Sequence, residues 1–514
     1  MAVSHQWFVQ WSAPPMLFAD ITSQYKDVNE RWNNDKPKWS EPLVVPEQSD
    51  DSYNDDQNQG SWTESNKYKF KSNRLKNNDH TGAAGVTLWL TMLGVMRAQS
   101  VPADNDTPPF STLYKWKHVD FEFPSPRHRR HALSTGKYVP ANVLPLGLEV
   151  WGSRVWVTVP AWRRGVPATL ATVPREGGIT SPLLKPYPDW SFHRAFGVKE
   201  NCTGLTSVFR VQADPCGRLW VLDSGQIDSQ DNPKQLCPPS VVVFDLQSDT
   251  LIARYTIPKQ YVLEDSLFAN LMIDTRLPDC SDLHVYIADT WRFGLLVFRQ
   301  SDVKFWRFTN PLFFPDPLAS NFTLHGLNFQ WTDGIFGLAL TPIDSDEERI
   351  LFFHPMSSYR EFYVSTAVLR DPSRVGNSSS EFNIAGESRG LSGQSSASAV
   401  DRRGVMFYGL VTQDSVGCWN TRKLYNRETN GIVTSNPKTL IFPNDIKIDQ
   451  DERQSLWVIS NRLPMFQAGP LDLDDYNYRI LYADTTDAVR GTVCDPNSDL
   501  PPPAISVIRR GLIY

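Results

Sequence analysis

A short hydrophobic segment that ends in a polar turn recurs six times along the chain. Successive copies begin 65, 65, 66, 55 and 50 residues apart. The copies are VWVTVP from Val155, WVLDSG from Trp220, VYIADT from Val285, LFFHPM from Leu351, MFYGLV from Met406 and LWVISN from Leu456. Most copies follow a turn that holds Asp, Gly, Ser or Arg, and other hydrophobic segments lie before and after. Each repeat therefore predicts three or four strands.

Six similar sheets of this size favour one architecture. A single four-stranded sheet cannot cover both of its own faces, so each sheet must stack on its neighbours, and a closed ring leaves no unpaired end. We therefore expect an all-β fold, a six-bladed β-propeller. The segment Leu113–Phe123 precedes the first copy and Asn477–Thr485 follows the last. We expect this N-terminal strand to pair with the C-terminal one and close the ring.

The charge of the chain excludes one class of partner. The formal net charge is -6, and a nucleic-acid-binding protein needs a basic face to neutralise phosphates. We therefore predict no nucleic-acid partner. The local exception is Arg127–Arg130, which reads RHRR and fits the recognition pattern of basic convertases. A solvated basic turn that stays uncut is the favoured interpretation of this segment.

The first hundred residues do not resemble a domain. Residues 1–81 are polar and poor in aliphatic side chains, which predicts a disordered leader or a start assigned too early. Residues 82–100 hold an apolar run followed by small residues, with lysines and arginines before it, in the order of a signal peptide. A signal-anchor behind a long tail is the second interpretation, and a buried helix is the third. We expect secretion, no stable membrane span and a propeller over 101–514.

The cysteines and sequons fit an extracellular chain. The six cysteines include no C-x-x-C pair of the kind that binds zinc or acts in redox chemistry, and they allow fifteen pairings between which the sequence cannot choose. Four N-x-S/T sequons predict glycosylation. They begin at Asn105, Asn201, Asn321 and Asn377.

Several long motifs resemble one family in particular. These motifs are DPCGRLWVLDSG, LMIDTRLPDCSDLHVYIADTWRFGLLVF, SSASAVDRRGVMFYGLV and FPNDIKID, and they occur in order. Over about Leu113 to Asn497 the chain resembles the Yellow and major royal jelly protein family of insects. The resemblance implies a secreted, often glycosylated six-bladed propeller. Members of that family are tied to pigmentation of melanin and cuticle, to nutrition, to binding of biogenic amines and to dopachrome conversion.

The axial channel of a propeller is the expected ligand site, because polar residues of all the blades converge there. A protonated amine needs a carboxylate, a catechol or indole needs an aromatic wall, and ring hydroxyls need polar partners. For Asp223 and Asp445 the alternative is an acid that caps a turn, and for Trp291 and Phe442 it is packing between blades. The candidates are Asp223, Asp289, Trp291, His354, Thr412, Gln413, Phe442, Asn444, Asp445 and Asn461.

Two functions share this channel. The first is binding of a small aromatic amine or a catechol-derived compound, with a role in pigmentation or cuticle. The second is a dopachrome-converting isomerase or tautomerase, in which Asp223 or Asp289 would be the buried general base. A calcium-dependent hydrolase of the lactonase kind is a third possibility, with oxygens from Asn444, Asp445, Asn461 and Asp223. We predict no cofactor and no resident metal, and the sequence leaves the oligomeric state open.

Overall fold

The computed structural model describes residues 108–497 apart from four short internal stretches, which are 178–179, 195–201, 230–231 and 344–347. Within this described part, no helix is long and apolar enough to cross a bilayer. The expected leader (1–81) and the signal-like segment (82–100) lie outside the described residues, so both remain predictions. Two of the expected glycosylation sites, Asn105 and Asn201, also lie outside, whereas Asn321 and Asn377 are exposed.

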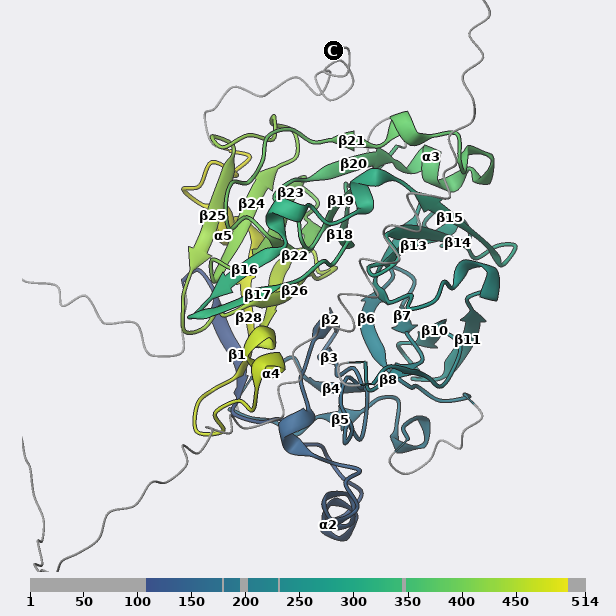
Figure 1. Cartoon of the computed structure of the whole chain (residues 1–514), viewed down its shortest axis with the longest axis vertical. Helices are drawn as coiled ribbons and strands as arrows, with labels where there is room; N and C mark the ends of the chain where they lie inside the picture. Colours follow the sequence, from purple (N-terminus) through teal and green to yellow (C-terminus); the bar gives the residue numbers. More distant parts are fainter. Residues whose placement is uncertain (1–107, 178–179, 195–201, 230–231, 344–347, 498–514) are drawn as a thin grey trace, which may run out of the picture. The chain divides into compact units, whose positions relative to one another are not determined.

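Six four-stranded antiparallel sheets make up the fold, and Figure 1 shows them arranged around a common axis. The six recurring hydrophobic segments form the second strand of each sheet, counted from the axis. The structure is therefore the six-bladed β-propeller that the repeats predict.

The first three blades follow one another in sequence. Blade 1 consists of β2 (Gly147–Trp151), β3 (Arg154–Thr158), β4 (Leu170–Pro174) and β5 (Lys185–Pro186). Blade 2 consists of β6 (Val208–Ala213), β7 (Arg218–Asp223), β10 (Ser240–Asp245) and β11 (Leu251–Thr256). Blade 3 consists of β12 (Phe268–Thr275), β13 (Leu283–Asp289), β14 (Gly294–Arg299) and β15 (Lys304–Thr309).

The last three blades include the one that joins the two ends of the propeller. Blade 4 consists of β18 (Ile335–Leu340), β19 (Ile350–Pro355), β20 (Phe362–Ser365) and β21 (Asn383–Ile384). Blade 5 consists of β22 (Ser395–Val400), β23 (Val405–Leu410), β24 (Ser415–Asn420) and β25 (Asn430–Ser435). Blade 6 consists of β26 (Pro443–Ile448), β27 (Ser455–Ser460), β28 (Tyr478–Asp484) and β1 (Ser111–Trp116).

Few elements lie outside the blades. Two small hairpins lie outside the blades. They are β8 (Gln226–Ile227) with β9 (Lys234–Gln235), between two strands of blade 2, and β16 (Asn321–Leu324) with β17 (Leu327–Gln330), between blades 3 and 4. The described helices are α2 (Pro126–Ser134), α3 (Thr366–Arg370), α4 (Leu463–Ala468) and α5 (Thr485–Val489). The RHRR segment lies inside α2 and is therefore helical, not the basic turn expected from its composition.

The first strand of each blade lines the axis. These inner strands contact one another in chain order from β2 through β6, β12, β18, β22 and β26, and β26 contacts β2 again. The ring is therefore closed. The aromatic residues of the second strands fill the space between blades, as Trp220 and Trp457 show with no more than 2% of their surface exposed. This burial of apolar surface between sheets is what a single sheet cannot achieve alone.

The ring closes through the N-terminal strand, as the sequence predicts. β1 pairs antiparallel with β28, and Trp116 stands opposite Tyr478. The strand also binds blade 1, because Tyr114 Oη donates to the Pro174 carbonyl at 3.0 Å and Trp116 Nε1 donates to the Pro182 carbonyl at 2.9 Å. β1 ends at Trp116, earlier than the expected Phe123. It therefore joins the last blade to the first.

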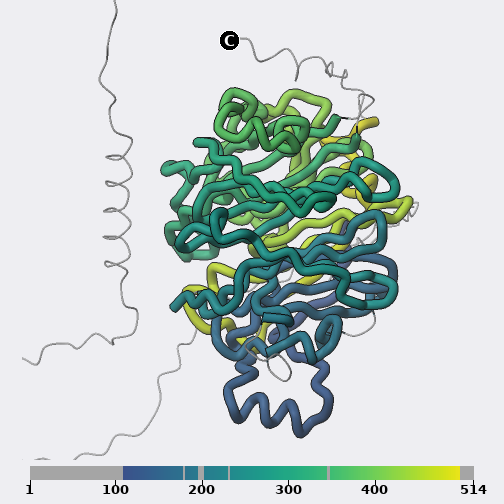
Figure 2. Tube along the Cα trace, turned by 90° about the vertical axis from the view of Figure 1, so that its right-hand side faces the viewer, coloured from purple at the N-terminus to yellow at the C-terminus, as the bar shows by residue number. Residues whose placement is uncertain are grey.

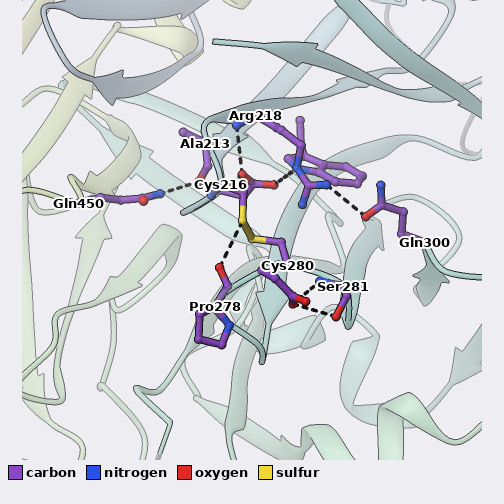
Figure 3. Close-up of a disulfide and its surroundings, with 11 residues drawn as sticks. Ala213, Cys216, Arg218, Pro278, Cys280, Ser281, Gln300 and Gln450 are labelled. Carbon is purple, nitrogen blue, oxygen red and sulfur yellow. Dashed lines mark hydrogen bonds and ion pairs between the residues drawn. A yellow bond between two sulfur atoms is a disulfide. The ribbon is translucent and has the colours of Figure 1, made fainter. Parts of the chain in front are cut away.

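All six cysteines form disulfides, which are Cys202–Cys237, Cys216–Cys280 and Cys418–Cys494. Figure 3 shows Cys216–Cys280, which joins turns of blades 2 and 3. Beside it the buried Asp214 accepts hydrogen bonds from Trp220 Nε1 at 2.7 Å and Arg218 Nε at 2.6 Å. The acid of this recurring turn therefore fastens the turn to the second strand of its own blade.

Candidate axial binding site

The propeller axis has two ends. We call the end where the six inner strands begin the start end, and the end where they run into their turns the finish end. Most of the residues predicted from the sequence lie at the start end, because they occupy the last positions of second strands or the first positions of inner strands.

The carboxylates of Asp223 and Asp289 are occupied by neighbouring donors. Asp223 accepts hydrogen bonds from three backbone N–H groups, those of Thr206, Ser207 and Gly225, at 2.8 to 3.0 Å. Asp289 is fully buried, and Arg307 Nη1 lies 2.8 Å from its Oδ2. It also accepts from the Leu267 backbone N–H and from a serine hydroxyl. The contacts of Asp223 have the geometry of the capping alternative. The contacts of the two acids leave little of either carboxylate for an amine.

The other candidates at the start end also contact protein groups. Trp291 Nε1 donates to Asp333 at 3.2 Å, and the ring of Phe442 meets that of Trp331 edge-on. Thr412 and Gln413 come together, because both side chains donate to the Ser392 carbonyl at 2.8 Å. The Asn461 amide, just after β27 of blade 6, donates to the Pro145 carbonyl just before β2 of the neighbouring blade 1. The structure therefore places Phe442 in blade packing and Asn461 in an interblade hydrogen bond.

His354 connects two blades. It is fully buried in β19, with Nδ1 2.9 Å from a Glu361 carboxylate oxygen and Nε2 2.6 Å from the Ser396 carbonyl oxygen on blade 5. Its ring lies against the backbone of Gly337 on the inner strand β18, at a distance that leaves no room for a Cβ there. The imidazole therefore links blade 4 to blade 5.

Asn444 and Asp445 meet at a buried cation. The Arg210 side chain is fully buried, its Nη2 donates to Asn444 Oδ1 at 2.7 Å, and its Nε lies 3.4 Å from Asp445 Oδ2. Burial lowers the pKa of this guanidinium, and the Asp445 carboxylate acts in the opposite direction. Because these oxygens already bind a fixed organic cation, they are not available to calcium in the way a lactonase would require.

One other group of side chains has metal-like spacing among the described residues. The ligand atoms of Asp214, Cys216 and Cys280 lie within 4.8 Å of one another. Both cysteines are joined in a disulfide, and metal binding to cysteine requires a free thiolate. This group therefore does not offer a metal site in its oxidised form.

A cavity of about 140 Å³ lies on the axis toward the finish end. All six inner strands contribute to its wall, and Asp445 is the one sequence-predicted residue among those that line it. The new polar residues there include a carboxyl, an ammonium, a guanidinium, two amides and a hydroxyl, from Glu149, Lys447, Arg349, Gln212, Asn270 and Ser398. The Ser398 hydroxyl is buried and has no hydrogen-bond partner among the described residues.

Glu149 is a buried carboxyl in this cavity whose pKa is raised. Only 4% of its surface is exposed, and its carboxylate accepts hydrogen bonds from the backbone N–H groups of Val150 at 2.8 Å and Ala213 at 3.2 Å. Burial raises the pKa of Glu149 to about 7, although the nearby Lys447 ammonium acts to lower it. A carboxyl with this pKa can both release and accept a proton near neutral pH.

Replacing Arg210 with Met is expected to lower the free energy of unfolding by about 3–5 kcal/mol, because Asp445 would stay buried without its cation. Denaturant unfolding followed by tryptophan fluorescence measures the change. The double variant Arg210→Met/Asp445→Asn should recover most of the loss, since it removes both charges. A single variant as stable as the parent would show that Asp445 does not depend on Arg210.

Comparison with known proteins places the chain in a family. The family model described as major royal jelly protein matches residues 206–494. A dopaminechrome tautomerase of Drosophila melanogaster is 43% identical over 393 residues, which cover 75% of this chain and 84% of the relative. Protein yellow of Drosophila melanogaster is 39% identical over 405 residues, which cover 78% of this chain and 74% of the relative. The chain therefore belongs to the major royal jelly protein family, which includes the Yellow proteins.

Proposed function

We propose that this protein is secreted and binds a small aromatic amine or a catechol-derived compound, with a role in pigmentation or cuticle. The observation that carries the binding proposal is the axial cavity, to which every blade contributes and which holds the buried carboxyl of Glu149 beside Lys447. Three disulfides support an oxidising compartment. The names of two relatives support the ligand class and the role in pigmentation. One is a dopaminechrome tautomerase and the other is protein yellow.

The polar groups of the cavity complement such a ligand. The Glu149 carboxylate suits a protonated amine, whereas the Lys447 ammonium and the Arg349 guanidinium suit catechol or quinone oxygens. Arg349 is held in place, because its Nη1 lies 2.9 Å from Asp274 and its Nε donates to the Thr341 carbonyl. A volume of about 140 Å³ is smaller than the roughly 300–1,000 Å³ of pockets for drug-sized ligands. The cavity therefore favours a compact ligand with one or two rings.

Calorimetric titration with two matched ligands tests this proposal. Dopamine carries an amine and 4-methylcatechol does not, so only dopamine can pair with Glu149. We expect Glu149→Gln to weaken dopamine binding roughly tenfold, the loss of one charge-assisted contact, and to leave 4-methylcatechol binding nearly unchanged. Serotonin should follow dopamine, because it carries the same kind of amine.

The exposed Glu428 on blade 5 provides the control for charge, since Glu428→Gln removes one carboxylate that does not line the cavity. This variant should bind dopamine as the parent does. Equal weakening of both ligands by Glu149→Gln would mean that the carboxyl shapes the cavity without pairing with the amine. Parent protein that takes up neither ligand would contradict the binding proposal.

A second function is favoured by one specific observation, the raised pKa of Glu149. In a tautomerisation of an indolequinone, a base removes a proton from a saturated ring carbon and a quinone oxygen gains a proton, with no net oxidation or reduction. Glu149 can act as that base, and Lys447 can stabilise the oxygen while its negative charge develops. Both functions would use the same cavity, and turnover distinguishes them.

A further inference from the structure

The helix α2 is the most basic surface element of the described chain. It holds three arginines and two histidines in five consecutive residues, Arg127–His131, and no acidic residue in its first turn. Four of these five side chains are exposed, and Arg129 is half-buried. Figures 1 and 2 show the helix standing out from the body of the propeller. A chain with a net charge of -6 thus presents a concentrated positive surface at one place.

The helix has an anchoring side and a free side. On the anchoring side Ala132 is buried and Arg129 pairs with Asp120, with Nη2 and Oδ2 2.7 Å apart. Arg127, Arg130 and His131 are spaced three and four residues apart, which places them on one side of a helix with neighbouring Cβ atoms about 5–6 Å apart. We call these three residues the basic stripe. Among the described residues, neither Arg127 nor Arg130 has a hydrogen-bond or ion-pair partner for its side chain.

One residue of the stripe, Arg127, lies where a positive charge is electrostatically unfavourable for the isolated helix. Arg127 lies in the first turn, where the helix dipole is positive and where a negative charge would stabilise the helix by about 0.3–1 kcal/mol. An anionic partner at the stripe would offset this repulsion. The base of the helix is already ordered, because Tyr138 Oη donates to the Val119 carbonyl at 2.7 Å and the rings of Phe123 and Trp190 stack at 5.1 Å. Binding would therefore order little additional backbone.

We propose that the basic stripe binds a sulfated polysaccharide. Guanidinium groups bind tetrahedral oxyanions through paired N–H donors, and the repeating sulfates of a polysaccharide can meet successive arginines of one helix side. A membrane is a poorer partner, because the apolar residues of α2 are Ala132, which is buried, and Leu133, which is only 37% exposed. Membrane-surface helices need a broad apolar face. The disulfides indicate an oxidising compartment, where such polysaccharides occur.

Binding of the purified full chain to immobilised heparin tests the proposal. The double variant Arg127→Glu/Arg130→Glu should bind heparin at least roughly tenfold more weakly, because two attractive exposed pairs become repulsive. The matched control Arg422→Glu/Arg427→Glu makes the same change in charge at two exposed arginines of blade 5. This control should change the affinity less than about twofold. Parent binding should also weaken as salt is raised, as expected for exposed charges.

Each other outcome would overturn the proposal. Equal loss in the two double variants would show a general charge effect without a specific stripe. Stripe-dependent binding to phosphatidylserine vesicles, without binding to heparin, would identify a membrane as the partner. A thermal melt of each variant checks the fold, and Arg127→Gln/Arg130→Gln replaces the charge reversal if that variant does not fold. If Arg127→Gln/Arg130→Gln folds and keeps full affinity for heparin, the basic stripe is not the heparin-binding site.

Discussion

A chain that lacks residues 108–117 is expected to unfold at a temperature far below that of the parent, or to fail to fold. The deletion removes β1, which completes blade 6 and contacts blade 1. Three aromatic side chains of the deleted segment, Phe110, Tyr114 and Trp116, are no more than 2% exposed. Truncating one such side chain costs about 3–5 kcal/mol, so losing three approaches the roughly 5–15 kcal/mol that stabilises a typical domain.

Two variants of Trp116 separate the contribution of its buried aromatic side chain from that of its hydrogen bond. Trp116→Ala is expected to lower the free energy of unfolding by about 3–5 kcal/mol. Trp116→Phe keeps an aromatic side chain but loses the hydrogen bond to the Pro182 carbonyl, which should lower it by about 1 kcal/mol. Differential scanning calorimetry of the purified protein measures all three changes. A truncated protein that unfolds at the parental temperature would show that the strand is not part of the stabilising ring.

The fold was predictable because its determinants are repeated. Each blade contains the same hydrophobic second strand, so six similar segments indicate six similar sheets even where single residues differ. The closure by β1 followed from the need to pair β28, which would otherwise be an open edge. The end of β1 was not predictable in the same way. The chain turns away after Trp116 and Phe121 bridges to Leu184 of blade 1, a contact that depends on the placement of two blades.

The candidate site was predictable only in its general location. Asp223 and Asp289 stand out in the sequence because each closes a hydrophobic strand, and the same position brings each carboxylate within reach of the backbone N–H groups at the start of the inner strand. Glu149 has no such signal. It interrupts the hydrophobic strand GLEVW as a single acid, and a search for buried acids inside inner strands could have found it. Its nearness to Lys447 depends on ring closure between blades 1 and 6.

The pairing of Arg210 with Asn444 and Asp445 was also not predictable from the sequence. Arg210 and Asn444 are separated by 234 residues, and their hydrogen bond forms on the axis where β6 and β26 converge. The motif FPND suggested that Asn444 and Asp445 supply oxygen ligands. The cation that they bind is Arg210 in the middle of strand β6 (VFRVQA), where an arginine would ordinarily be expected to point to solvent. Only the placement of both strands shows that the oxygens are already paired.

Glu149→Gln is expected to abolish the pH dependence of any dopaminechrome turnover near neutral pH and to lower the rate by about 10²–10⁴-fold, the usual contribution of a general base. The base acts when deprotonated, so the parental rate should rise with pH and level off above about 7, the pKa to which burial raises Glu149. The measurement is the loss of dopaminechrome absorbance between pH 5 and pH 9, corrected for the uncatalysed reaction, with Glu428→Gln as the control. A parental rate that rises through pH 7 and persists unchanged in Glu149→Gln would assign the proton transfer to another group.

The titration of Glu149 is expected to lower stability over the pH range in which it raises the rate. This difference separates an effect on catalysis from an effect on folding. Burial raises the pKa of Glu149 from 4.5 to about 7, so between these values the folded chain binds more protons than the unfolded chain. The contribution of Glu149 to the free energy of unfolding therefore falls as the pH rises through this window, by a total of about 3 kcal/mol. Glu149→Gln should remove this fall, and above pH 7 the variant should be at least as stable as the parent. Lost turnover in a variant that keeps its melting temperature at pH 8 then reflects the missing base, whereas a parallel loss of stability would mean that the carboxylate is needed for its hydrogen bonds to Val150 and Ala213.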